Sequence, residues 1–271
     1  MKKVCFTGHT KEDYKFNFNQ DRMCAFTIVS DNFYYPVGTH IFVNSFLRFH
    51  SDDNIDLIVF RQDMIDKVFG EKGINFYQAK PYFGEIVANM GYQLVCNIDA
   101  DTIITGRLTE VFDKINFDIA MPENLNDYEN ASFENITEEM YLQAGMVAST
   151  SKNFWKAWQK INRTAMKYLR KENDTVNLLI YNDPEISKLK LKILDKDKDY
   201  YGCKSLGREP EFTINSKGET ICRGEKVKAY HFARGNVFPK LDIPNMPLTD
   251  EVKKRWLEIA TYGQSIKIKN V

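Results

Sequence analysis

The sequence has few cysteines, and none of them is spaced as a metal-binding or redox pair. There are five, an odd number, and no two form a CxxC motif. This pattern gives no sign of a disulfide framework or of a cysteine zinc site. We therefore expect a reduced, cytoplasmic protein in which Cys96, inside an apolar run, is a small buried hydrophobic residue.

Net charge and long apolar runs are also lacking. Lys plus Arg and Asp plus Glu each total 37, so the formal net charge is zero. A neutral chain has no general attraction to nucleic acid, although local basic patches remain possible. No apolar run approaches the length of a membrane span, and the opening MKKVCFTGHTKED is charged too early for a signal peptide. We predict neither a nucleic-acid partner nor a transmembrane segment.

Short apolar runs alternate along the chain with longer amphipathic ones. The short runs predict strands at 25–30, 56–60, 93–98, 117–121, 144–149 and 226–232. The longer patterns predict helices at 38–49, 82–90, 151–172 and 249–261. Strands that alternate with helices are typical of an α/β sheet covered by helices on both faces. Ligands bind such sheets at the carboxyl ends of the strands.

Two carboxylates stand at one such strand end, in QLVCNIDADTIITG, residues 93–106. Asp99 and Asp101 directly follow a strongly apolar strand. Charge beside low-dielectric surface is unfavourable unless a cation shares the site. Carboxylate oxygens suit Mg²⁺ or Mn²⁺, and such an ion could neutralise a diphosphate leaving group. The plainer alternative is a pair of solvated turn residues.

The same residues also match the Asp-x-Asp-x-Thr signature of haloacid-dehalogenase-like phosphatases. In that interpretation Asp99 is the nucleophile and Asp101 the general acid/base. The segment MVAST at 146–150 would be the Ser/Thr strand end, and ILDKDKD at 193–199 the acidic metal motif. The residues alone leave both enzyme classes open.

Five segments together resemble one family: AFTIVSDNFYYPVGTHIFVNSF, YQAKPYFGEIV, VCNIDADTIITG, YLQAGMVAS and AYHFARGNVFPK. From about residue 25 to 240 the chain resembles the GT-A-fold glycosyltransferases, in particular family eight, which includes glycogenin and bacterial lipooligosaccharide galactosyltransferases. The resemblance implies an α/β GT-A fold, with one mixed, mostly parallel sheet flanked by helices. We predict a single domain, 1–271, whose parts are a nucleotide and metal half (about 20–121), a sugar and acceptor half (about 122–245) and a C-terminal helix and tail (246–271).

The resemblance also implies a metal and a nucleotide site. Asp99 and Asp101 would bind Mn²⁺ or Mg²⁺, with His231 as the third protein ligand. The nucleotide and diphosphate of a UDP-sugar would contact Ile28, Ser30, Asp31, Tyr34, Lys80, Gly235 and Lys240. Lys80 stands where the family usually has an arginine, and Arg234 is an alternative to Lys240 as the phosphate-binding cation.

Sugar-binding residues are implied at two further places. Gln143 replaces the family's asparagine and would touch the sugar. The family's Asp-Gln-x-x-x-Asn pattern corresponds to ENDTVNLL in one of two registers. In the first, Glu172 and Asn173 replace the Asp and Gln; in the second, Asp174 aligns with the Asp and Thr175 replaces the Gln. The candidate catalytic residues are therefore Glu172, Asn173, Asp174 and Gln143.

The implied activity is metal-dependent transfer of a hexose from a UDP-sugar to an acceptor hydroxyl, with retention at the anomeric carbon. The acceptor would be a glycan or another hydroxyl compound, bound by variable loops at 122–142 and 200–225. Two alternatives stay open: the phosphatase, and a catalytically silent module that binds sugar nucleotides.

Overall fold

The computed structural model describes residues 4–7, 21–29, 37–50, 54–61, 65, 76–123, 141–165, 172–194, 200–203, 212–222, 224–232, 243, 246 and 248–261. The chain forms two compact units. The first comprises residues 1–28, 54–98 and 114–194, and the second residues 29–53, 99–113 and 195–271. Within the described ranges, no helix is both long enough and apolar enough to cross a membrane.

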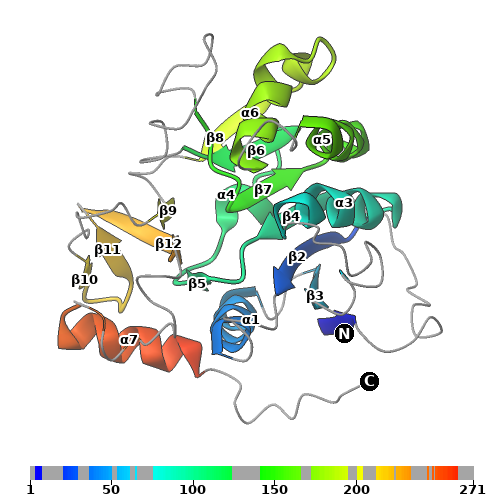
Figure 1. Ribbon diagram of the computed structural model, residues 1–271. Helices are drawn as coiled ribbons and strands as arrows, with labels where there is room; N and C mark the ends of the chain where they lie inside the picture. The colour runs from blue at the N-terminus through cyan, green and yellow to red at the C-terminus, as the bar shows by residue number, and fades with distance from the viewer. Residues whose placement is uncertain are drawn as a thin grey trace. The chain divides into compact units, whose positions relative to one another are not determined.

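A seven-stranded sheet forms the centre of the first unit (Figure 1), in the order β1-β3-β2-β4-β7-β6-β8. The strands are β1 (Val4–Thr7), β2 (Met23–Val29), β3 (Ile55–Arg61), β4 (Leu94–Ile98), β6 (Ile119–Pro122), β7 (Met146–Ser149) and β8 (Leu191–Leu194). The pairs β1–β3, β2–β4 and β6–β8 are parallel, whereas β7 runs antiparallel to both of its neighbours. The mixed, mostly parallel sheet expected from the sequence is confirmed.

The helices of the first unit pack against this sheet. They are α3 (Phe76–Asn89), α5 (Lys152–Ala165) and α6 (Glu172–Asn182), with a 3₁₀ turn at Ile186–Lys188. All five residues of β4 are buried, which explains its uninterrupted apolar sequence, since a strand covered on both faces needs no alternation. On α5, the apolar stripe of Phe154, Trp155 and Trp158 is fully buried, and the Trp155 ring lies 5.9 Å from that of Phe26.

The second unit contains a smaller sheet and two longer helices. Its elements are α1 (Val37–His50), β5 (Thr102–Ile104), α4 (Thr109–Phe112), β9 (Tyr200–Cys203), β10 (Phe212–Ile214), β11 (Thr220–Cys222), β12 (Glu225–His231) and α7 (Asp250–Ala260). The strand order is β10-β11-β12-β5, and β9 also pairs with β12. Trp256 of α7 packs among the rings of Phe212, Tyr230 and Phe232 and donates a hydrogen bond to the Thr220 hydroxyl.

Most predicted elements are confirmed within one to three residues of their expected bounds, and two differences have physical reasons. The second sheet was not expected, because β5, β10 and β11 are three residues each and too short to show periodicity. Helix α3 begins at Phe76 rather than at residue 82 and contains Pro81, a residue that usually ends helices. The helix predicted at 151–172 is confirmed over Lys152–Ala165; residues 166–171 lie outside the described ranges, and α6 begins at Glu172.

Close packing of α3 on α5 depends on Gly84. A Cβ atom built at Gly84 would lie 2.0 Å from Cε3 of Trp155, far inside contact distance. Gly84→Ala is therefore expected to lower the free energy of unfolding by about 1–3 kcal/mol, the usual effect of overpacking. Alanine's better helix propensity, about 1 kcal/mol, would not offset this.

Urea unfolding measures this effect. The matched control is Asn89→Ala at the exposed end of the same helix, which should change stability by less than about 0.5 kcal/mol. A Gly84→Ala protein as stable as the wild type would contradict the packing of Trp155 against α3.

Candidate functional site

The two carboxylates predicted from the sequence lie beside the predicted histidine. Asp99 and Asp101 are in the turn between β4 and β5, and His231 is the last residue of β12. Because β12 pairs antiparallel with β5, His231 stands opposite Thr102, and the Phe232 amide donates to the Asp101 carbonyl at 2.9 Å. Backbone pairing thus brings together side chains that are far apart in the sequence.

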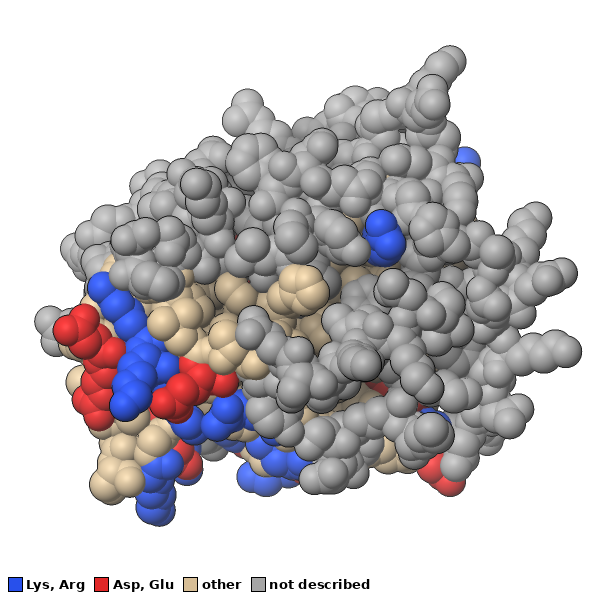
Figure 2. Space-filling view, turned by 90° about the horizontal axis from the view of Figure 1, so that it is seen from below, with Lys and Arg blue, Asp and Glu red and all other residues tan. Residues whose placement is uncertain are grey.

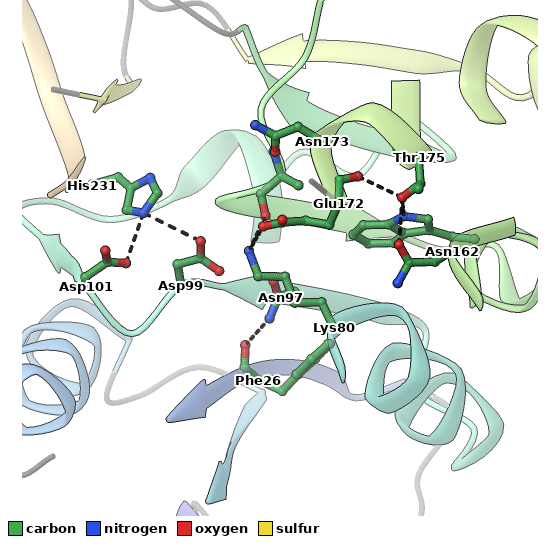
Figure 3. Close-up of polar contacts among 12 residues, drawn as sticks. Phe26, Lys80, Asn97, Asp99, Asp101, Asn162, Glu172, Asn173, Thr175 and His231 are labelled. Carbon is green, nitrogen blue, oxygen red and sulfur yellow. Dashed lines mark hydrogen bonds and ion pairs between the residues drawn. The ribbon is translucent and has the colours of Figure 1, made fainter. Parts of the chain in front are cut away.

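The side-chain geometry of this group is compact (Figure 3). Nε2 of His231 lies 2.9 Å from Oδ1 of Asp101 and 3.5 Å from Oδ2 of Asp99. One ligand atom from each of the three residues lies within 4.8 Å of the other two. The carboxylates are 19% and 18% exposed and the imidazole 8%, so the group is reachable but largely shielded. Two carboxylate oxygens and an imidazole nitrogen form a donor set that could hold a divalent metal ion.

Neighbouring contacts hold the strands that carry this group. The Ser45 hydroxyl of α1 accepts a hydrogen bond from the Ile104 amide of β5 at 3.0 Å. On β12, Lys228 forms an ion pair with Glu110 of α4 at 2.7 Å. Burial alone would raise the pKa of Glu110, but hydrogen bonds from Lys228 and Thr109 outweigh it and hold the pKa below its ordinary value. The carboxylate therefore stays ionised at neutral pH and keeps the contact between α4 and β12.

A second polar group lies in the first unit, where Lys80 of α3 meets Glu172 at the start of α6 (Figure 3). Lys80 Nζ donates to Glu172 Oε1 at 2.7 Å and lies 3.4 Å from the Ala144 carbonyl oxygen. Both charged side chains are only 8% exposed. Burying two charges is unfavourable unless they pair closely, so each residue requires the other.

Side-chain amides of α6 fix the segment that carries Gln143. Oδ1 of Asn177 accepts from the Leu142 amide, and its Nδ2 donates to the Leu142 carbonyl, both at 2.8 Å. Oδ1 of Asn173 accepts from the Ala144 amide at 2.8 Å. Gln143, 4% exposed, is thus held from both sides by its neighbours.

The other two residues of the ENDT segment bond within the first unit. Asp174 accepts a hydrogen bond from the Tyr141 hydroxyl at 2.6 Å. The Thr175 hydroxyl accepts from Trp158 Nε1 at 3.0 Å and lies 2.9 Å from both Oδ1 of Asn162 and the Glu172 carbonyl oxygen. Thr175 is fully buried by these contacts.

Several predicted nucleotide-binding residues lie outside the described part of the chain: Ser30, Asp31, Tyr34, Arg234, Gly235 and Lys240. Ile28 is described; it is 7% exposed and belongs to the core of the first unit. Most of the expected acceptor loops, including 124–140, is likewise outside the described ranges. Asn177, which takes the closing Asn position of the family's Asp-Gln-x-x-x-Asn pattern in the first register, bonds through its side-chain amide to the main chain of Leu142.

Comparison with known proteins places the fold. No protein-family model matches the chain, and no curated protein matches it in sequence. The galactosyltransferase LgtC, solved with donor and acceptor sugar analogues, is 13% identical with a TM-score of 0.55, over 88% of this chain and 95% of LgtC. The bifunctional glycosyltransferase WbbM is 15% identical with a TM-score of 0.54, over 89% of this chain and 50% of WbbM.

A third match is the glycosyltransferase GlyE of Streptococcus pneumoniae, 12% identical with a TM-score of 0.50, over 89% of this chain and 60% of GlyE. These identities are low, so the likeness is one of fold. The GT-A fold expected from the sequence resemblance is confirmed.

The buried ion pair gives a stability prediction. Lys80→Met leaves the Glu172 carboxylate buried without its cation and should lower the free energy of unfolding by about 3–5 kcal/mol. The double variant Lys80→Met/Glu172→Met removes both charges and should recover most of that loss. Chemical denaturation of the two variants and the wild type measures the difference.

Lys188→Met is the control, since the Lys188–Glu185 pair is 68% and 81% exposed and should contribute less than about 1 kcal/mol. If Lys80→Met and Lys80→Met/Glu172→Met were equally stable, the two buried charges would not depend on each other.

Proposed function

We propose that the protein is a metal-dependent glycosyltransferase that moves a hexose from a UDP-sugar to an acceptor hydroxyl, with retention at the anomeric carbon. One observation carries this proposal. In a chain with the fold of known glycosyltransferases, Asp99, Asp101 and His231 converge directly after β4. LgtC was solved with donor and acceptor sugar analogues, which supports a sugar donor and a sugar or other hydroxyl acceptor here.

In this proposal Asp99, Asp101 and His231 hold Mn²⁺ or Mg²⁺. The donor set supports this, because two carboxylates and an imidazole offer three ligands and leave room for phosphate oxygens. When bound, the cation offsets the negative charge of the diphosphate leaving group. The imidazole adds a ligand without adding negative charge, so the protein does not repel the diphosphate further.

Lys80, Glu172, Asn173 and Gln143 are proposed to orient the donor hexose. Two contacts favour the first register of the ENDT segment, in which Glu172 and Asn173 take the family's Asp and Gln positions. Glu172 is paired with Lys80, the cation that the resemblance assigns to the donor. Thr175, the Gln position of the second register, is fully buried by contacts with Trp158 and Asn162. Asp174 is then a positioning residue, bonded to Tyr141.

The nucleotide would be held by Ile28, Ser30, Asp31 and Tyr34, and the diphosphate by Gly235, Lys240 and Lys80. This part of the proposal rests on the sequence resemblance. Ile28 belongs to the core, so its contribution would be apolar contact with the nucleoside.

The strand register argues against the phosphatase alternative. That interpretation needs the hydroxyls of MVAST close to Asp99. However, β7 runs antiparallel to β4, and Ser149 pairs with Val95, whereas Met146 pairs with Ile98, the residue before Asp99. Ser149 therefore stands level with the amino-terminal part of β4, on the order of 10 Å along the strand from its carboxyl end.

Metal binding gives the first test of the proposal. Mn²⁺ should raise the thermal midpoint of the wild type, by an amount equivalent to about 2.7 kcal/mol at a free concentration near one hundred times Kd. His231→Ala should weaken Mn²⁺ binding, measured by titration followed by electron paramagnetic resonance of the free ion. His40→Ala, an exposed histidine on α1, is the control and should bind as the wild type does. If His231→Ala binds Mn²⁺ as tightly as the wild type, His231 is not a ligand of the metal.

Donor hydrolysis gives the second test. The protein with Mn²⁺ is given UDP-, GDP- and dTDP-sugars, and p-nitrophenyl phosphate in parallel. We expect release of UDP from one UDP-hexose, abolished by EDTA and reduced at least about a hundredfold in Asp101→Asn, because the missing ligand charge acts on the leaving group. Asp250→Ala, an exposed residue in the first turn of α7, is the control and should keep full activity.

The outcomes separate the alternatives. Phosphate released from the aryl ester with every sugar nucleotide intact would establish the phosphatase. Binding of UDP and Mn²⁺ without turnover of any donor in the presence of glycan acceptors would establish the silent module.

A further inference from the structure

Helix α5 carries a row of cations on its exposed face. Lys152, Lys156, Lys160 and Arg163 are all exposed, and at about 100° per residue they fall within an arc of about 80°. We call these four residues the basic face. It extends over twelve residues, from Lys152 to Arg163, or roughly 16 Å of helix. The opposite side of α5 is the buried Trp and Phe stripe, so packing fixes the direction in which the basic face points.

No acidic side chain balances these charges within the described residues. Helix α5 contains no Asp or Glu, and none of the four cations forms an ion pair with a described carboxylate. This includes Glu85 on α3, the helix that packs against α5. The chain as a whole is neutral, so the rest of it carries a net charge of −4 against the +4 of this helix.

Helix α7 shows that this is a property of α5 and not of exposed helices in general. It has three basic residues and three acidic ones within Asp250–Ala260, and Arg255 pairs with Glu258 at 3.4 Å. Figure 2 shows basic and acidic side chains intermixed on the described surface around this helix. The two exposed helices therefore offer a matched comparison within one molecule.

The residue types absent from the basic face limit the kinds of partner that it can bind. A protein interface usually has an apolar or aromatic centre, and single-stranded nucleic acid is usually bound by exposed aromatic rings. Among the residues of α5 whose burial is described, the exposed ones are the four cations, Asn153 and Thr164, and the aromatic residues Phe154, Trp155 and Trp158 are fully buried. What remains is a row of cations on one helix face, which fits a broad anionic surface that needs no shape complementarity.

We propose that the basic face of α5 docks the protein onto the anionic lipid headgroups of a membrane. The attraction is electrostatic, because no apolar side chain on this face can enter the bilayer. Each basic residue near an anionic leaflet strengthens binding roughly fivefold, and the effect falls off within a Debye length. This inference does not depend on the proposed sugar chemistry, and binding of this kind does not require a membrane-spanning segment.

Vesicle sedimentation tests the proposal. The full-length protein is mixed with vesicles of phosphatidylcholine alone or of phosphatidylcholine with phosphatidylserine. We expect binding only to the anionic vesicles, with a steep loss as salt increases. Lys152→Gln/Lys156→Gln/Lys160→Gln should weaken binding about a hundredfold, since three fivefold contributions are removed. The control Lys217→Gln/Lys253→Gln/Lys254→Gln removes the same formal charge from the second unit and should bind within about threefold of the wild type.

Three results would overturn the proposal. The first is equal binding of the wild type to anionic and neutral vesicles, and the second is weakening of vesicle binding to the same extent by the two triple variants. In the third result, the α5 variant loses binding to a single-stranded oligonucleotide but still binds vesicles. The thermal midpoint of each variant checks that it is folded. If a variant is not folded, the salt titration of the wild type still tests whether vesicle binding is electrostatic.

Discussion

The pairing of β12 with β5 is the contact on which the candidate metal site depends. Asp99 and Asp101 follow β4 in the chain, but a third ligand reaches them only because β12 returns antiparallel to β5 in a register that sets His231 opposite Thr102. The bond from the Phe232 amide to the Asp101 carbonyl fixes the same turn from its main chain. A shift of one residue in that register would turn the imidazole to the other face of the strand.

The carboxylate pair can be singled out from the sequence for a physical reason. A buried strand must be apolar, and two carboxylates at its end are a departure from that rule that can be read without a structure. His231 was proposed differently, from the resemblance of AYHFARGNVFPK to the closing segment of the glycosyltransferase family. The longer strands and α1 were also predicted, because their periodicity extends over enough residues to be recognised.

Other features could not be predicted, because they depend on partners that sequence spacing does not reveal. The ion pair of Lys80 with Glu172 joins α3 to α6, and neither residue shows that it is buried. Asn162 and Thr175 look like ordinary polar positions, yet both are almost completely buried around Trp158 Nε1. A prediction from hydrophobic patterns assigns polar residues to the surface. It therefore misses polar residues that are buried in the core with their hydrogen bonds made.

The side-chain amide of Asn177 occupies the position beside Leu142 that a neighbouring strand would take in a sheet. Its two hydrogen bonds to Leu142 are the pair that a neighbouring backbone would make, while the next amide, of Gln143, bonds outward to the Pro122 carbonyl. Because these contacts reach only main-chain atoms, the backbone of this segment does not depend on which side chains it carries. A substitution at position 143 therefore leaves these main-chain contacts in place, whereas a substitution at Asn177 removes both bonds to Leu142.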